Sequence, residues 1–273
     1  MTEFLSQLAL FWRPGLTGAL LALALPLLGL YLRLRQEYWA ALAYGQVGAA
    51  GALGALALGA PSLAGGLAAS LAVAGVKHRL EKRLPAGLFP LFFILGWSAS
   101  LLLTANLPGV ERLGAALFEG QLYFAGLEML CGAALVLVVG IFFLRRAGKM
   151  ILLACLNPAH FHAQRLPTWP VRAGFDLLVA ASLALAVMSL GVMGAFALVF
   201  IPPWLVFAFA PNWRTALVAA PALAFVAYAL AFALALVYDQ PFGPVLALVL
   251  GVSASILPIA DVLHAGGRAE SGQ

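Results

Sequence analysis

Residues 145–172 read RRAGKMILLACLNPAHFHAQRLPTWPVR and form the conspicuous polar interruption in the second half of the chain. We read five apolar blocks before this stretch and four after it. An apolar block of about 20 residues is long enough to cross a membrane as a helix. The pattern therefore predicts an all-α, polytopic bundle of membrane spans with one long polar segment in its middle.

The composition is that of a membrane protein. Hydrophobic residues make up 64% of the 273 residues, charged residues make up 9%, and the mean hydropathy is +1.04. Soluble domains usually have about 25% charged residues. We therefore expect residues 1–273 to form a single transmembrane domain, with a cytoplasmic segment at about 145–172. The net charge of +5 does not indicate nucleic-acid binding, because the basic residues lie at the ends of apolar blocks.

Nine blocks have the lengths and breaks expected of membrane spans. The break at 59–61 divides the long block 38–76 into two, and 106–122 is expected to be an outer loop with a short interfacial helix. A count of eight stays open, because the block 61–76 is short and could be re-entrant. The predicted spans are 15–34, two within 38–76, 88–105, 124–144, 173–190, 192–210, 216–238 and 244–263.

The Lys and Arg residues predict the orientation of these spans. Of the 15 Lys and Arg residues, only Arg13 and Arg112 fall on the outer side of a nine-span arrangement, so the remaining 13 lie inside. Membrane proteins keep an excess of Lys and Arg on the cytoplasmic side. We expect a multi-pass protein of the cell (inner) membrane with its amino end outside and its carboxyl end in the cytoplasm.

Several motifs resemble those of a known family. The stretch from 11 to 263 resembles the membrane permease of the ABC uptake systems for zinc, manganese and iron. Residues 157–167, NPAHFHAQRLP, are similar to that family's D-P-x-x-A-x-x-x-G-L-P segment. The other matching stretches are GLYLRLR at 29–35, VRAGFDLL at 171–178, GVMGAFALVFIPPWL at 191–205 and YDQPFGPVLALVLG at 238–251.

The resemblance implies a half-transporter. Two permease chains, expected to be identical, would surround a pore, two cytoplasmic ATPase subunits would bind ATP and magnesium, and an extracytoplasmic solute-binding protein would deliver the solute. This chain would then be a pore subunit, not an enzyme, with no cofactor of its own. The resemblance assigns coupling to the ATPase to Asn157, Pro158, His160, Phe161, His162, Gln164, Arg165 and Leu166.

The second predicted span departs from the family pattern. The family usually has G-D-A-L-S-H-A there, and the resemblance implies that the Asp and His of this motif contact the passing metal. This chain has WAALAYG at 39–45, with Ala40 in place of the Asp and Tyr44 in place of the His. Tyr44 and Gln46 are therefore our candidates for the substrate path, together with Glu128 and Asp176. These two acids lie in the first turns of spans, where a carboxylate is costly and is a functional candidate.

The histidines and cysteines point to no further site. His160 and His162 form an H-x-H pair without a third ligand nearby, so we assign no metal ligands. No two histidines face each other at membrane depth, which disfavours a haem-bearing subunit. We place Cys131 on a buried helix and Cys155 in a cytoplasmic loop, and neither implies a disulfide.

The function that we expect is import of a divalent metal ion, of the zinc or manganese class, by ATP-driven alternating access. One alternative is an ABC permease for a chelated metal or a small organic solute, since the second span lacks the usual Asp and His. A second alternative, from another class, is a membrane-anchor or electron-transfer subunit of a membrane complex. The stretch around Lys149 is not a phosphate loop, so the chain is not expected to hydrolyse nucleotide.

Overall fold

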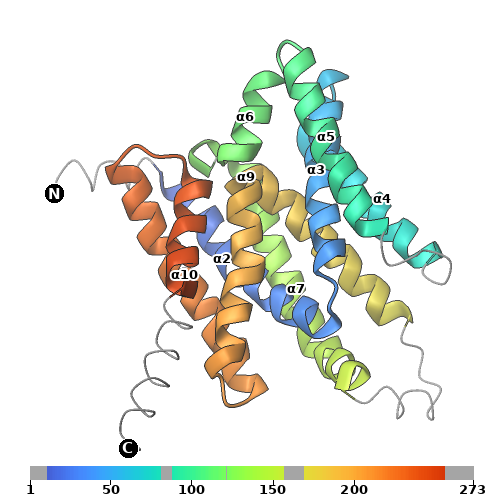
Figure 1. Ribbon diagram of the computed structural model, residues 1–273, viewed down its shortest axis with the longest axis vertical. Helices are drawn as coiled ribbons and strands as arrows, with labels where there is room; N and C mark the ends of the chain where they lie inside the picture. Colours follow the sequence, from blue (N-terminus) through green and yellow to red (C-terminus); the bar gives the residue numbers. More distant parts are fainter. Residues whose placement is uncertain (1–10, 81–87, 121, 157–168, 256–273) are drawn as a thin grey trace, which may run out of the picture.

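The computed structural model describes residues 11–80, 88–120, 122–156 and 169–255, and every regular element in these ranges is a helix (Figure 1). The all-α, polytopic prediction is confirmed. The helices are α2 (Trp12–Arg35), α3 (Tyr38–Ala57), α4 (Ser62–Leu80), α5 (Leu88–Asn106), α6 (Glu111–Glu119), the 3-10 turn η1 (Leu122–Phe124), α7 (Leu127–Leu156), α9 (Trp169–Phe209), α10 (Trp213–Val237) and a last helix, Phe242–Ser255.

Six of the described helices are long and apolar enough to cross a membrane: α2, α3, α5, α7, α9 and α10. Helix α9 has 41 residues and contains the predicted spans 173–190 and 192–210, which meet at a kink at Gly191. Helix α4 is continuous and has 19 residues, but its last turn carries Lys77, His78 and Arg79. With α4, the two halves of α9 and the last helix, described helices lie at all nine predicted positions, the last of them up to residue 255 of the predicted 244–263.

The short helix is also confirmed, since α6 occupies Glu111–Glu119 within the predicted loop 106–122, and the outer side of this loop stays a prediction. Helix α7 differs from the prediction. We expected the fifth span to end at 144, but α7 continues to Leu156 because Ala147, Gly148 and Ile151 supply a buried face beyond Arg145 and Arg146. The prediction that Cys155 lies in a loop is therefore wrong. Cys131 is exposed on α7, so its predicted burial is wrong as well.

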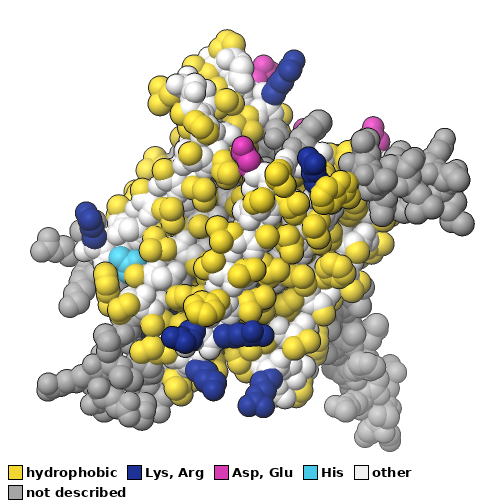
Figure 2. All heavy atoms as spheres, turned by 180° about the vertical axis from the view of Figure 1, so that it is seen from behind, with side chains coloured by type: hydrophobic (Ala, Val, Ile, Leu, Met, Phe, Trp, Pro, Cys, Tyr) yellow, Lys and Arg dark blue, Asp and Glu magenta, His cyan; other side chains and the backbone are white. Residues whose placement is uncertain are grey.

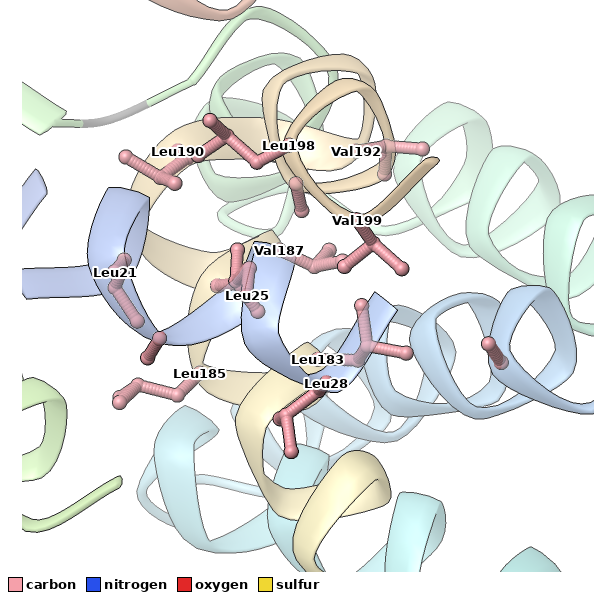
Figure 3. Packing of buried hydrophobic residues seen from close by; sticks show 14 of the residues in the cluster. Leu21, Leu25, Leu28, Leu183, Leu185, Val187, Leu190, Val192, Leu198 and Val199 are labelled. Carbon is pink, nitrogen blue, oxygen red and sulfur yellow. The ribbon is translucent and has the colours of Figure 1, made fainter. Parts of the chain in front are cut away.

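The core of the bundle lies between α2 and α9. Figure 3 shows Leu21, Leu25 and Leu28 of α2 packed beside leucine and valine side chains from both halves of α9. A side-chain carbon added to Gly29 of α2 would meet the backbone carbonyl oxygen of Val199 in α9. Small residues let helix backbones approach closely, which is the usual source of helix association in lipid. These two helices therefore pack closely at the centre of the bundle.

Most of the described Lys and Arg side chains gather at one end of the bundle. A row of Lys and Arg side chains lies along the lower edge of the face shown in Figure 2, whereas the visible Asp and Glu side chains lie toward its upper end. We call the lower end the basic end. It is formed by the end of α2, the end of α4, the second half of α7, the start of α9 and the start of α10. Its described cations are Arg33, Arg35, Lys77, Arg79, Arg145, Arg146, Lys149, Arg172 and Arg214.

Candidate functional site

A cluster of buried charges lies at the basic end, and the corner between α2 and α3 forms its first part. Arg35 is the last residue of α2, and Gln36 caps that helix with φ of 55° and ψ of 33°, in the left-handed region. This residue reverses the chain, so that Arg35 and Glu37 meet with 2.8 Å between guanidinium nitrogen and carboxylate oxygen. Glu37 also lies 2.9 Å from the ammonium group of Lys77, at the end of α4.

Asp176 is the centre of this charge cluster, which we define as Arg35, Glu37, Lys77, His78 and Asp176. The Asp176 side chain is 1% exposed, and its carboxylate lies 2.8 Å from Lys77 Nζ and 3.2 Å from an Arg35 nitrogen. His78 Nε2 lies 3.1 Å from the same carboxylate. Asp176 is in the second turn of α9, so the cluster joins the start of α9 to the α2–α3 corner and to the end of α4.

The cluster satisfies charges that would be costly alone. An isolated ion removed from water costs several kcal/mol, and a partner must offset that cost. Two cations, Arg35 and Lys77, face two carboxylates here. The carboxylates of Asp176 and Glu37, at 3.2 Å and 2.8 Å from the Arg35 guanidinium, offset the cost of burying this charge. The Arg35 guanidinium also lies 5.0 Å from the ring centre of Phe175, which adds a cation–π contact.

A polar cavity of about 470 Å³ opens beside the charge cluster. Its walls come from the α2–α3 corner, the last turns of α7 and the first turn of α9. The lining residues are Leu34, Arg35, Gln36, Glu37, Met150, Ile151, Ala154, Cys155, Val171 and Arg172. Helices α7 and α9 are the two that border residues 157–168. The cavity and the cluster therefore lie at the base of the segment for which the resemblance implies coupling to an ATPase.

The residues proposed for coupling, Asn157, Pro158, His160, Phe161, His162, Gln164, Arg165 and Leu166, lie outside the described residues. Their role stays a prediction. What the structure does describe is the pair of helix ends that hold this segment, Leu156 of α7 and Trp169 of α9. Trp169 makes an edge contact with His78, with 6.3 Å between the ring centres. The start of α9 is therefore joined to the charge cluster at two positions. Asp176 is a member of the cluster, and Trp169 contacts its member His78.

The proposed substrate-path residues Tyr44 and Gln46 are fully buried in α3. Among the described residues, neither the amide nitrogen nor the amide oxygen of Gln46 has a hydrogen-bond partner. A buried amide without partners is costly and rare in a resting structure. Gln46 therefore has unused hydrogen-bonding capacity inside the bundle.

The other two path candidates lie in different places. Asp176 is in the charge cluster, whereas Glu128 is exposed in the first turn of α7, far along that helix from the basic end. The structure therefore places Asp176 at the basic end and Glu128 at the opposite end of α7. In the described part of the chain, no three His, Cys, Asp or Glu side chains are close enough together to hold a metal ion.

The sequence identifies Asp176 but not its partners. In the sequence, Arg35, Glu37, Lys77 and His78 count as charges at the flanks of spans, which set the orientation. One signal could have found them, because a carboxylate inside a span needs a cation, and the available cations are those at the ends of neighbouring spans. Which ends are neighbours depends on the packing of α2, α4 and α9, and their order along the chain does not give it.

Known proteins resemble this chain over nearly its whole length. A model of the ABC 3 transport family matches residues 7–259. The chain belongs to the ABC 3 transport family. It is a multi-pass membrane permease of an ABC transporter, so the predicted resemblance is confirmed. Members of this family are transport permeases, not catalytic subunits.

Two solved structures have the same fold as this ABC 3 family permease. PsaBC from Streptococcus pneumoniae, in complex with a Fab, aligns with a TM-score of 0.81 at 13% identity, over 93% of this chain and 94% of that chain. An inward-facing conformation of a putative metal-chelate type ABC transporter aligns with a TM-score of 0.71 at 15% identity, over 96% of this chain and 89% of that chain. Among curated proteins, no sequence matches this one.

Proposed function

We propose that this ABC 3 family permease imports a divalent metal ion, of the zinc or manganese class, by alternating access driven by a separate ATPase. Two copies of the chain would surround the pore, and an extracytoplasmic solute-binding protein would deliver the ion. The family match supports transport, and the likeness to a metal-chelate type ABC transporter supports a metal-containing substrate. The observation that carries the mechanism is the charge cluster, which ties the base of the predicted coupling segment to three helices.

The mechanism follows from this connection. When ATP closes the motor subunits, residues 157–166 move with them and displace the start of α9. Asp176 is held there by Arg35, Lys77 and His78, so the displacement reaches the α2–α3 corner and the end of α4. Helix α3 carries Tyr44 and Gln46, and its movement would change the side of the membrane from which the solute can reach these two residues. The change is a shift between two packed arrangements, because a packed core does not deform continuously.

A second candidate substrate is a chelated metal or a small organic solute. The observation that favours it is the chemistry of α3, where Ala40, Tyr44 and Gln46 offer a hydroxyl and an amide but no carboxylate or imidazole. A bare divalent cation needs such ligands to replace its hydration water, whereas a solute with its own polar groups can bind to neutral donors and acceptors. Family membership sets aside the alternative of a membrane-anchor or electron-transfer subunit.

The coupling assignment predicts the effect of charge in the proposed ATPase contact. In the reconstituted complex, Phe161→Asp with Leu166→Asp should abolish the stimulation of ATP hydrolysis by the permease, because a charged surface cannot seat in an apolar groove. The measurement is ATPase turnover of the partner with and without the permease. Leu58→Asp is the control, since Leu58 is 88% exposed at the turn after α3 and should leave turnover unchanged. Full stimulation in the double variant would exclude the docking role.

The path assignment predicts that stability and transport change in opposite directions. Gln46→Leu removes a buried amide that has no partner among the described residues, so the variant should be more stable by about 1 kcal/mol. Solute uptake by Gln46→Leu with Tyr44→Phe should nevertheless fall at least about tenfold, because the path loses its polar contacts. Melting temperature and uptake into proteoliposomes are the two measurements.

The control for this pair is Ser70→Ala. Ser70 is also fully buried and donates a hydrogen bond of 2.8 Å to the carbonyl oxygen of Ala180, which joins α4 to α9. This variant should lower the melting temperature and leave the uptake per folded complex unchanged. Normal uptake by the Tyr44 and Gln46 double variant would remove both residues from the path.

A further inference from the structure

A groove of about 710 Å³ lies at the basic end, between α7 and α10. Helix α2 packs against both of these helices and forms its floor. Tyr31 of α2 and Trp213 of α10 line the groove and meet edge to face, with 5.1 Å between the ring centres. The groove is separate from the charge cluster and from the polar cavity, which lie on the α9 side of α2.

The lining of this groove has two chemical parts. One part is apolar and consists of Leu27, Ile141, Leu144, Leu152 and Leu217. The other part consists of three cations, Arg145 and Lys149 from α7 and Arg214 from α10, and all three are exposed. The lining contains no Asp or Glu among the described residues, and none of these cations is in an ion pair described for this structure.

The position along the bundle matches a membrane interface. Arg145 follows the apolar part of α7, and Arg214 is in the first turn of α10, so both cations mark the level where the hydrocarbon region ends. Tyr31 and Trp213 are the residue types that gather at this level. A basic pocket between membrane helices on the cytoplasmic side is the kind of site that holds anionic lipid headgroups.

A second copy of this chain is a poorer match for the groove. Chains that insert in one orientation place their basic ends at the same level, so a neighbour would bring cations toward cations. The described exposed acids Glu111, Glu119, Glu128 and Asp239 lie toward the other end of the bundle. The described acids at the basic end, Glu37 and Asp176, are both held in the charge cluster.

We propose that the groove between α7 and α10 binds an anionic phospholipid. Lys149 and Arg214 hold the headgroup phosphate from opposite walls, with Arg145 beside them, and the leucine-lined part holds the upper acyl chains. The cations supply preference for anionic over zwitterionic headgroups, and the apolar wall supplies preference for a lipid over a free anion. Bound lipid would bridge α7 and α10 across α2 at the end of the bundle where the ATPase is expected to dock.

The test is lipid binding to the delipidated full-length chain, measured by native mass spectrometry with phosphatidylglycerol or phosphatidylcholine. Near a membrane surface each Lys or Arg contributes roughly fivefold in affinity for anionic lipid. Lys149→Gln with Arg214→Gln should therefore weaken phosphatidylglycerol binding about 25-fold. The matched control is Arg79→Gln with Arg146→Gln, which removes the same charge from exposed cations of the basic end outside the groove and should change binding less than about twofold.

Each other outcome would overturn the proposal. Equal weakening in both double variants would mean diffuse attraction to surface charge, and no weakening in either would mean that the groove holds no headgroup. Equal binding of both lipids to the unmodified chain would exclude recognition of the anion, and displacement by millimolar inorganic phosphate would mean an anion site without a lipid. Loss of a dimer in the groove variant alone would assign the groove to a second copy. Melting temperatures of both double variants check that each is folded.

Discussion

Asp176→Ala is expected to lower the free energy of unfolding by about 3 to 5 kcal/mol, because it leaves Glu37 as the one described carboxylate that faces two buried cations, Arg35 and Lys77. Arg35 and Lys77 lie 3.2 Å and 2.8 Å from the Asp176 carboxylate, and the side chains of both are 7% exposed. Thermal unfolding of the purified chain in detergent measures the effect, and the milder Asp176→Asn extends the series if the alanine variant does not fold.

Two further variants make this prediction specific to the charge cluster. Asp239→Asn removes an exposed acid at a residue with φ of 50°, a conformation that asparagine tolerates, and should change stability by less than about 0.5 kcal/mol. Lys77→Gln with Asp176→Asn removes one charge of each sign, so its cost should be smaller than the sum of the two single costs by about 1 to 3 kcal/mol. Two results would contradict the stabilising role of the cluster. One is a double variant whose cost equals the sum of the Lys77→Gln and Asp176→Asn costs, and the other is an Asp176→Ala variant that loses as little stability as Asp239→Asn.

Gly191→Ala is expected to be the most damaging glycine replacement in the described bundle. Gly191 has φ of 77° and ψ of 166°, a conformation open almost only to glycine, and forcing alanine into it costs about 1 to 3 kcal/mol. A side-chain carbon there would also lie 2.7 Å from the backbone nitrogen of Gly120 and 3.2 Å from the carbonyl oxygen of Leu117. Both atoms are backbone, so neither can move away without displacing the chain between α6 and η1.

The consequence should be large because three segments meet at Gly191. Gly120 follows α6 with φ of 92°, and a side-chain carbon on Gly243 would lie 2.8 Å from the carbonyl oxygen of Leu190. We expect Gly191→Ala to give little folded protein, measured as the monodisperse yield after gel filtration. Gly251→Ala is the control, since a side-chain carbon there meets nothing within 4 Å and alanine favours a helix. Similar yields for both variants would mean that folding does not require the glycine conformation at the Gly191 kink.

The sequence predicted the helices well because each span needs a continuous apolar block, and such blocks are visible without a structure. It also predicted the division of α9, since Gly191 and Gly194 interrupt the block there. The end of α7 was missed for a physical reason. Arg145 and Arg146 mark where the lipid ends, but a helix supported by packing continues beyond that level, and α7 does so to Leu156.

The candidate site was predicted less completely than the fold. Asp176 and Tyr44 can be identified from the sequence. Asp176 is an acid inside a predicted span, and Tyr44 stands where the family usually has a histidine. The partners of Asp176, Arg35 on α2 and Lys77 on α4, were not identified, because the packing of α2 and α4 against α9 depends on how small residues let helices cross. Gln46 was named from the sequence, but its lack of partners among the described residues could come only from the packing around α3.

The most direct test of the proposed function is ATP-driven uptake into proteoliposomes that contain this chain and its partner ATPase, with the binding protein outside. The proposed function predicts uptake of a divalent ion, Mn²⁺ or Zn²⁺, that requires ATP, stops when Phe161 and Leu166 are replaced by aspartate, and falls with the Tyr44 and Gln46 double variant. Uptake that is independent of ATP, or a complex that hydrolyses ATP and moves neither ion alone nor a metal chelate, would contradict it.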